Sequence, residues 1–177
     1  MRNISHSFVV RVLCLLMATC FIMLLCLGCS KYHNASEEYK VKEMLTEKWS
    51  RGFCETTEPA MILRKTVYKS TEPVKEIAYQ LLNETSDRWN YGEQCILLYY
   101  YQDEWYRTNL GPLTSDAVLY DLLPYTEKEL SWRVTPYKED DPQFLFPGSY
   151  RLIKELYPYD RNAEQVSILL FSDFTVE

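Results

Sequence analysis

Hydrophobic residues are grouped in three successive patterns along the chain, and the first of these is a continuous apolar run. No charged residue occurs from Val12 to Cys29, whereas Arg2 and Arg11 precede this run and no acidic residue accompanies them. A basic start followed by an apolar stretch is typical of a signal peptide or of a short transmembrane anchor. The first pattern therefore predicts a targeting or anchoring segment.

A short helix is predicted after this segment. Ser36 followed by Glu37 and Glu38 is typical of a helix start, because acidic side chains are favoured at the positive end of the helix dipole. Apolar residues that share one face follow up to residue 50: Tyr39, Val41, Met44, Leu45 and Trp49. We expect a helix that packs on its own domain, serves as a loose stalk or contacts a partner.

From residue 58 onward the pattern predicts strands, since turn residues recur and β-branched and aromatic residues cluster between them. We expect strands at Met61–Lys69, Val74–Asn83, Gln94–Tyr101, Trp105–Thr108, Glu127–Val134, Tyr150–Leu156 and Val166–Val176, and a short strand or a turn at Ala117–Leu123. Short strands without a useful helical period after residue 55 indicate an antiparallel β-sandwich.

Alternation within these strands predicts which side chains face the core. Two sets point to one side of their strands: Ile77, Tyr79 and Leu81, and Leu130, Trp132 and Val134. Gln94–Tyr101 is apolar on both faces, which is typical of a central strand. Ser172 and Asp173 interrupt the last strand and predict either a bulge or the start of a separate short strand.

Composition and charge exclude some functions. The chain has 177 residues and a formal net charge of -6, and its two earliest arginines lie in the apolar N-terminal segment, so the remainder is more acidic still. An acidic body argues against nucleic acid as a partner, because phosphates bind basic surfaces.

The end of the apolar run carries a candidate processing site. Leu25-Cys26-Leu27-Gly28-Cys29 resembles a bacterial lipoprotein signal, although Cys26 stands where that family usually has leucine. The resemblance implies that Gly28 is the last residue removed and that Cys29 becomes a lipidated N-terminus. The alternative is an uncleaved anchor, and both place the body outside the membrane. The predicted organisation is a signal peptide (1–28), a tether with the short helix (29–57) and an antiparallel β-sandwich domain (58–177).

Two cysteines remain in the body once Cys14, Cys20, Cys26 and Cys29 are assigned to export and anchoring. They are Cys54 and Cys95, and a disulfide bond between them is permitted outside the cytoplasm. The other interpretation is a pair of unpaired thiols. His33 is the single histidine after residue 28, so we expect no zinc site and no other metal or cofactor.

The most informative segment of the body surrounds Tyr150. Pro147 and Gly148 predict a turn, and Tyr150 opens the following strand. This arrangement resembles the tyrosine corner of immunoglobulin-like sandwiches, in which the phenol bonds back to the backbone. We expect Trp105 and Trp132 to be the core tryptophans of the sandwich.

Several such pieces occur in the order found in a known family. They are Leu81–Thr85, Tyr91–Glu93, Asp103–Tyr106, Trp132, Pro147–Lys154 and Phe174–Val176. Together they cover roughly residues 60–177 and resemble the immunoglobulin-like domains of secreted proteins and lipoproteins, mainly of Gram-positive bacteria. The resemblance implies a fold and a location at the cell envelope, and it supplies no catalytic or binding residues.

No nucleophile-and-base motif, phosphate-binding loop or metalloprotease motif occurs in the sequence. The first functional hypothesis is therefore a non-catalytic module that binds an envelope protein or a glycan. The alternative is an enzyme or accessory subunit, for example one directed at glycans, that uses carboxylates in a loop-end cleft. Exposed, coplanar rings among Tyr99–Tyr101, Trp105-Tyr106 and Tyr157–Tyr159 would favour a glycan, whereas buried rings would oppose it.

Overall fold

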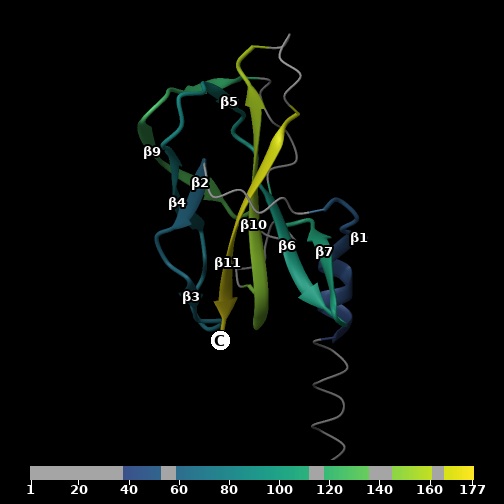
Figure 1. Cartoon of the computed structure of the whole chain (residues 1–177). Helices are drawn as coiled ribbons and strands as arrows, with labels where there is room; N and C mark the ends of the chain where they lie inside the picture. The colour runs from purple at the N-terminus through teal and green to yellow at the C-terminus, as the bar shows by residue number, and fades with distance from the viewer. Residues whose placement is uncertain (1–37, 53–58, 112–117, 136–144, 161–165) are drawn as a thin grey trace, which may run out of the picture. The chain divides into compact units, whose positions relative to one another are not determined.

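The chain folds mainly into β-strands, as a computed structural model of residues 38–52, 59–111, 118–135, 145–160 and 166–177 describes it (Figure 1). Within these ranges the strands are β1 (Leu45–Lys48), β2 (Ala60–Leu63), β3 (Val67–Tyr68), β4 (Glu76–Asn83), β5 (Trp89–Tyr91), β6 (Ile96–Tyr101), β7 (Glu104–Thr108), β8 (Tyr120–Leu122), β9 (Thr126–Arg133), β10 (Gly148–Pro158) and β11 (Ile168–Val176). Residues 38–44 are helical.

The strands form two sheets. The larger sheet has the order β1-β7-β6-β10-β11-β3, and the smaller sheet has the order β2-β4-β9. This is the immunoglobulin-like arrangement of two sheets packed face to face. Counted along that general fold, one sheet contains its first, second and fifth strands, and the other contains its third, sixth and seventh. The short strand β3 lies parallel to β11, while the other pairs are antiparallel. The predicted all-β sandwich is confirmed.

Strand β10 is the central strand of the larger sheet. On one side it pairs with β11 from Gly148↔Val176 to Leu156↔Ile168. On the other side it pairs first with β6 and then with β5, which in turn pairs with β8. Because β10 is longer than β6, its C-terminal half carries the β5 and β8 extension of the sheet, and this extension forms one wall of the cleft described below.

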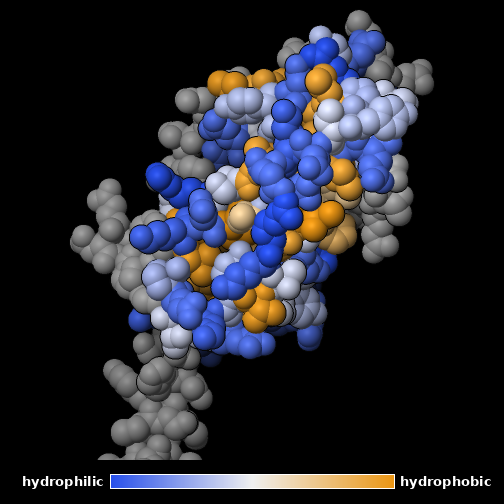
Figure 2. Space-filling model, turned by 90° about the vertical axis from the view of Figure 1, so that its left-hand side faces the viewer, coloured by the Kyte–Doolittle hydropathy of each residue, from blue (hydrophilic) through white to orange (hydrophobic). Residues whose placement is uncertain are grey.

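The alternation predicted from sequence is confirmed for the smaller sheet. Ile77, Tyr79 and Leu81 are buried on β4, and Trp132 is buried on β9. Successive residues of a strand point to opposite faces, so the intervening residues of β9 are polar and exposed. On the side of the molecule seen in Figure 2, hydrophilic residues accordingly predominate and hydrophobic ones are scattered between them.

The larger sheet buries apolar side chains on both faces. On its inner face, Tyr150 stacks on Phe174 with ring centroids 5.1 Å apart. On its outer face a second cluster contains Leu98, Ile153 and Leu169, with Trp49, Ile96, Trp105 and Phe171 packed against it. This explains why the segment of β6 is apolar on both faces, as predicted.

The second cluster also corrects the prediction for one of the two core tryptophans. Trp132 lies in the core between the sheets, being only 3% exposed. Trp105 instead is half-buried and belongs to the outer cluster. The physical reason is register: Trp105 pairs with Tyr100, whose side chain is exposed, and cross-strand partners share a face.

The sequence predicted a helix that extends through residue 50, and this predicted end is wrong. It ends at residue 44, and β1 follows, with Leu45 opposite Thr108 of β7. The β6–β7 hairpin presents an edge whose backbone groups need partners, and pairing with that edge outweighs a weak helical period. The compact unit that contains the sandwich therefore begins at Met44, earlier than residue 58.

Three further strand predictions are corrected. The segment predicted as one strand at Met61–Lys69 forms β2 and β3, which belong to different sheets. Strand β5 was not predicted at all. The pairing of β10 with β11 runs through Ser172 and Asp173 without a shift in register, so there is neither a bulge nor a separate strand at that point.

Candidate binding cleft

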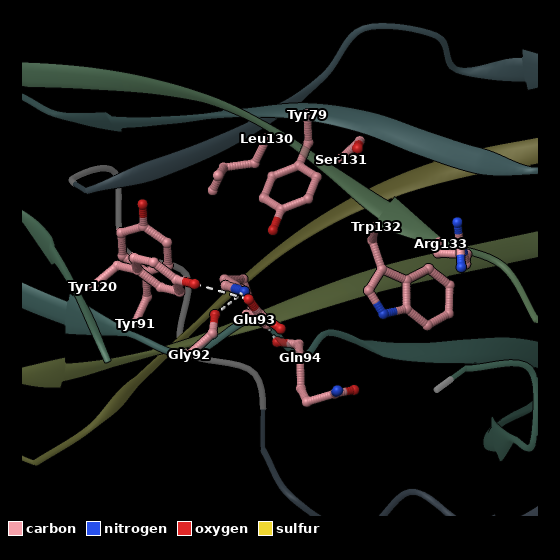
Figure 3. Close-up of a pocket in the computed structure, with 11 residues that line it drawn as sticks. Tyr79, Tyr91, Gly92, Glu93, Gln94, Tyr120, Leu130, Ser131, Trp132 and Arg133 are labelled. Carbon is pink, nitrogen blue, oxygen red and sulfur yellow. Dashed lines mark hydrogen bonds between the residues drawn. The ribbon is translucent and has the colours of Figure 1, made fainter. Parts of the chain in front are cut away.

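A cleft of about 350 Å³ lies between the two sheets, where the β5 and β8 extension faces β4 and β9 (Figure 3). Four aromatic side chains line it, each from a different strand: Tyr79 from β4, Tyr91 from β5, Tyr120 from β8 and Trp132 from β9. Its volume falls at the lower end of the range typical of small-molecule sites.

Two of these rings form one wall. Tyr91 and Tyr120 stack with ring centroids 5.6 Å apart. The Tyr120 hydroxyl donates a hydrogen bond of 2.8 Å to Oε1 of Glu93, and the dashed line in Figure 3 marks this bond. Tyr91 is buried, whereas Tyr120 is 40% exposed. Tyr120 and Glu93 therefore form a fixed rim at the solvent side of the cleft.

The floor of the cleft contains a buried lysine, Lys154 of β10, which is 1% exposed. Its Nζ donates hydrogen bonds to the backbone oxygens of Gly92 and Gln94, the latter at 3.1 Å. It also lies 5.4 Å from the ring centroid of Tyr91. Among the described residues, no carboxylate forms an ion pair with this ammonium group.

Burial lowers the pKa of Lys154, because the charged form loses its hydration, while Cys95 and Glu93 favour the charged form. The two backbone carbonyls supply neutral acceptors for the ammonium group. A buried cation with neutral partners is costly, since carbonyl dipoles replace its hydration only in part.

Cys95 borders the same lysine. Its thiol is free and buried, and Sγ donates a weak hydrogen bond of 3.5 Å to the hydroxyl of Tyr79. Burial raises the pKa values of both Cys95 and Tyr79, so both groups stay protonated at neutral pH. Tyr79 accepts the thiol hydrogen and keeps its own hydroxyl hydrogen for donation.

Trp132 presents a further donor. Its buried indole Nε1 has no hydrogen-bond partner among the described residues. A Cβ on Gly111 would lie 2.8 Å from Cζ2 of the Trp132 ring, so Gly111 packs against the six-membered ring. Figure 3 draws the indole nitrogen on the side of the ring that faces Gln94 rather than Arg133. Because the ring of Trp132 lines the cleft, this unsatisfied donor lies beside the space that a ligand would fill.

The lining suits binding better than acid–base chemistry. Glu93 is the one carboxylate among the described residues that line the cleft, and it already accepts the Tyr120 hydroxyl. Hydrolysis of a glycosidic bond commonly uses two carboxyl groups on either side of the bond. Within the described ranges, no group of three His, Cys, Asp or Glu side chains is placed to hold a metal ion.

The predicted tyrosine corner is present, at some distance from the cleft. The Tyr150 hydroxyl donates a 2.9 Å hydrogen bond to the backbone oxygen of Phe146, and Tyr99 donates one of 2.8 Å to Pro147. Gly148 has a φ of 146°, a conformation that favours glycine. None of these residues lines the cleft, so their role is structural.

Three of the predicted site residues, Gly28, Cys29 and Cys54, lie outside the described residues. Cys95 is free and buried, which agrees with the alternative of unpaired thiols rather than with a disulfide bond to Cys54. Within the parts of the chain that are described, no helix combines the length and apolar character that a bilayer span requires.

Sequence reasoning missed Lys154, although a signal for it exists. Tyr150, Leu152 and Leu156 alternate along β10 and are fully buried on the inner face. The same period places residue 154 on that face, and a lysine at such a position is rarely buried without a partner. A charged residue that interrupts the inward positions of a strand is therefore a signal that could have located the cleft.

The tyrosines predicted as a possible flat platform do not form one. Tyr100 and Trp105 are in contact, but their ring planes are tilted by 56°. Tyr99 is buried. Tyr157 and Tyr159 are exposed, and they lie at the C-terminal end of β10, beyond the part of this strand that pairs with β6. Stacking of a glycan on these rings is therefore disfavoured, and the cleft is the better candidate for a ligand.

No protein-family model matches the chain, and neither a curated protein nor a solved structure shows significant similarity to it. The fold and the cleft thus define the molecule as an immunoglobulin-like β-sandwich with a polar, aromatic-lined site between its sheets.

Proposed function

We propose that the protein is a membrane-attached, extracytoplasmic and non-catalytic binding module of the cell envelope, and that its binding site is the cleft between the sheets. The observation that carries this proposal is the buried indole Nε1 of Trp132, which lines the cleft without a partner among the described residues. Buried donors are nearly always satisfied in folded proteins, so an unsatisfied one beside a cavity favours a ligand.

The alternative function, an enzyme or accessory subunit that uses carboxylates, has less support. The described lining contributes Glu93 as a carboxylate, and a second carboxylate would be required for a glycosidase-like mechanism. We therefore expect no hydrolysis of cell-wall or peptide substrates by the purified protein. Turnover abolished by Glu93→Gln would reverse this ranking.

The attachment to the membrane is proposed from the sequence. Export followed by cleavage after Gly28 and lipidation of Cys29 would place the sandwich outside the membrane on a short tether. Mass spectrometry of the membrane fraction should find a chain that begins at Cys29 and carries lipid mass. An unmodified chain that begins at Met1 would instead support the uncleaved anchor.

Site-specific photo-crosslinking in intact cells tests binding at the cleft. A crosslinking residue at Leu130, which lines the cleft from the inward face of β9, should capture a partner or ligand. The matched control is Lys128, an exposed position on the same face of β9 but outside the lining. Equal products at both positions, or none at Leu130, would contradict a binding site in the cleft.

A further inference from the structure

We propose that the cleft binds a carboxylate group carried next to a hydrogen-bond donor, as found in an acidic sugar or at the free C-terminus of a peptide. This inference rests on the proposed binding function and names its ligand class. Three features of the cleft support it: the donors in the lining, the buried ammonium group at the floor and the size of the cavity.

Two side chains of the lining supply hydrogen-bond donors. Trp132 contributes an unpartnered N–H, and Tyr79 keeps a hydroxyl hydrogen for donation. Figure 3 shows the Tyr79 hydroxyl pointing toward Gly92 and Glu93. A carboxylate offers about four lone-pair sites on two oxygens, so one group satisfies both donors.

The charge at the floor favours an anion. Lys154 is buried with backbone carbonyls as hydrogen-bond partners. An anion bound in the cleft would compensate the buried ammonium group, which the neutral partners leave costly. In a low-dielectric site such a charge-assisted contact is stronger than a neutral one.

The negative charge of Glu93 determines which group must lie next to the carboxylate of the ligand. Its side chain is negative and stands at the rim, where it accepts the Tyr120 hydroxyl. A bare anion would be repelled there, whereas a ligand with an adjacent N–H or O–H group can donate to the free lone pairs of Glu93. An acylated amino acid and a sugar acid both carry such a donor next to the carboxylate.

The size and walls limit the ligand to one ring or one residue. A volume of about 350 Å³ suits a small ligand and is too small for a folded segment. The faces of Tyr91, Tyr120 and Trp132 offer contact to a flat or C–H-rich surface. We therefore expect end-on capture of a terminal group rather than binding along an extended chain.

Calorimetric titration of the full chain in detergent tests the ligand class. Glucuronate and N-acetylphenylalanine are the acidic probes, and methyl glucoside and N-acetylphenylalanine amide are their neutral counterparts. At least one acid should bind tenfold or more tightly than its neutral counterpart. The acid that binds identifies the source of the carboxylate as a sugar or a peptide terminus. Equal affinities within both pairs would overturn the carboxylate inference.

A conservative variant tests the site itself. Trp132→Phe keeps a flat ring and removes the N–H donor, so acid binding should weaken by roughly tenfold or more, the value of a hydrogen bond to a charged group. Trp89→Phe is the matched control, because Trp89 is a second buried tryptophan with an unpartnered Nε1 among the described residues but lies outside this cleft. Equal weakening in both variants would overturn the site.

The two proposals fail in different ways. If none of the four probes binds while the crosslink at Leu130 persists, the carboxylate inference is wrong and the binding function stands. If the probes do not bind and the crosslink at Leu130 is absent as well, both are wrong.

Discussion

The tyrosine corner gives the most direct test of how this fold is stabilised. Replacing Tyr150 by phenylalanine removes one hydroxyl and leaves the ring in place, stacked on Phe174 at 5.1 Å. Tyr150 is fully buried, and its hydroxyl donates to the backbone oxygen of Phe146 at 2.9 Å. The variant therefore isolates a single hydrogen bond that the sequence predicted.

The expected loss follows from the burial of the two partners. A hydrogen bond inside a protein contributes about 0.5–1.5 kcal/mol net, and an unsatisfied buried partner costs about 1–3 kcal/mol. Phe146 is only half-buried, so water partly replaces the lost donor at its carbonyl. We expect the free energy of unfolding to fall by about 1–1.5 kcal/mol. The melting temperature should fall by roughly 3–5 °C for a unit of this size.

Urea denaturation measures this change, and the slope of the transition should stay constant because the surface exposed on unfolding is the same. Tyr125→Phe is the control, since Tyr125 is 73% exposed, and it should change stability by less than about 0.5 kcal/mol. Should Tyr150→Phe prove as stable as the parent, the corner bond would contribute nothing and the reasoning would fail.

Three further predictions concern the same unit. Gly148→Ala should lower the free energy of unfolding in urea by about 2 kcal/mol, because a Cβ there would lie 2.6 Å from the Tyr99 ring and φ is 146°. Gly52→Ala is the control and should be tolerated, because the space around its Cβ is open. Arg151→Lys should lower the free energy of unfolding by about 1 kcal/mol in the same assay. The reason is that Arg151 makes two hydrogen bonds, of 2.6 and 2.7 Å, to Asp173 and lies over two aromatic rings. Unchanged stability would refute a role for this two-bond contact. Burial raises the pKa of Tyr79, so the stability that this phenol contributes is fully present below its unfolded pKa of about 10 and is lost as the pH rises above it. In an alkaline titration followed by absorbance at 295 nm, exposed tyrosines such as Tyr125 should ionise first, and the last part of the absorbance change should coincide with the loss of the circular-dichroism signal on unfolding. Ionisation of all tyrosines before unfolding would contradict this.

Residue periodicity by itself determined the fold class and most inward positions. Alternation along β4 and β9 follows from the extended backbone, which sends neighbouring side chains to opposite faces whatever the partner strand is. The tyrosine corner was predictable for a similar reason. Pro147, Gly148 and Tyr150 are close in sequence, so turn chemistry and strand start are local properties.

Pairing partners were decided by the tertiary structure. Residues 45–48 have a weak helical period, but the free edge of β7 offers a full set of backbone hydrogen bonds, and β1 forms there. In the same way, β3 leaves the sheet of β2 because it can pair in parallel with β11. Local patterns contain no information about which edge another part of the chain will present.

The cleft is likewise a product of tertiary structure. Tyr79, Tyr91, Trp132 and Lys154 come from four different strands, and each alone has the character of an ordinary strand residue. Alternation places them between the sheets, but it does not say where the sheets separate enough to leave a cavity. That separation depends on the length of β10 beyond β6 and on the β5 and β8 extension it supports. The sequence thus determined which side chains face inward, and only the packing of two sheets decided that four of them share a site.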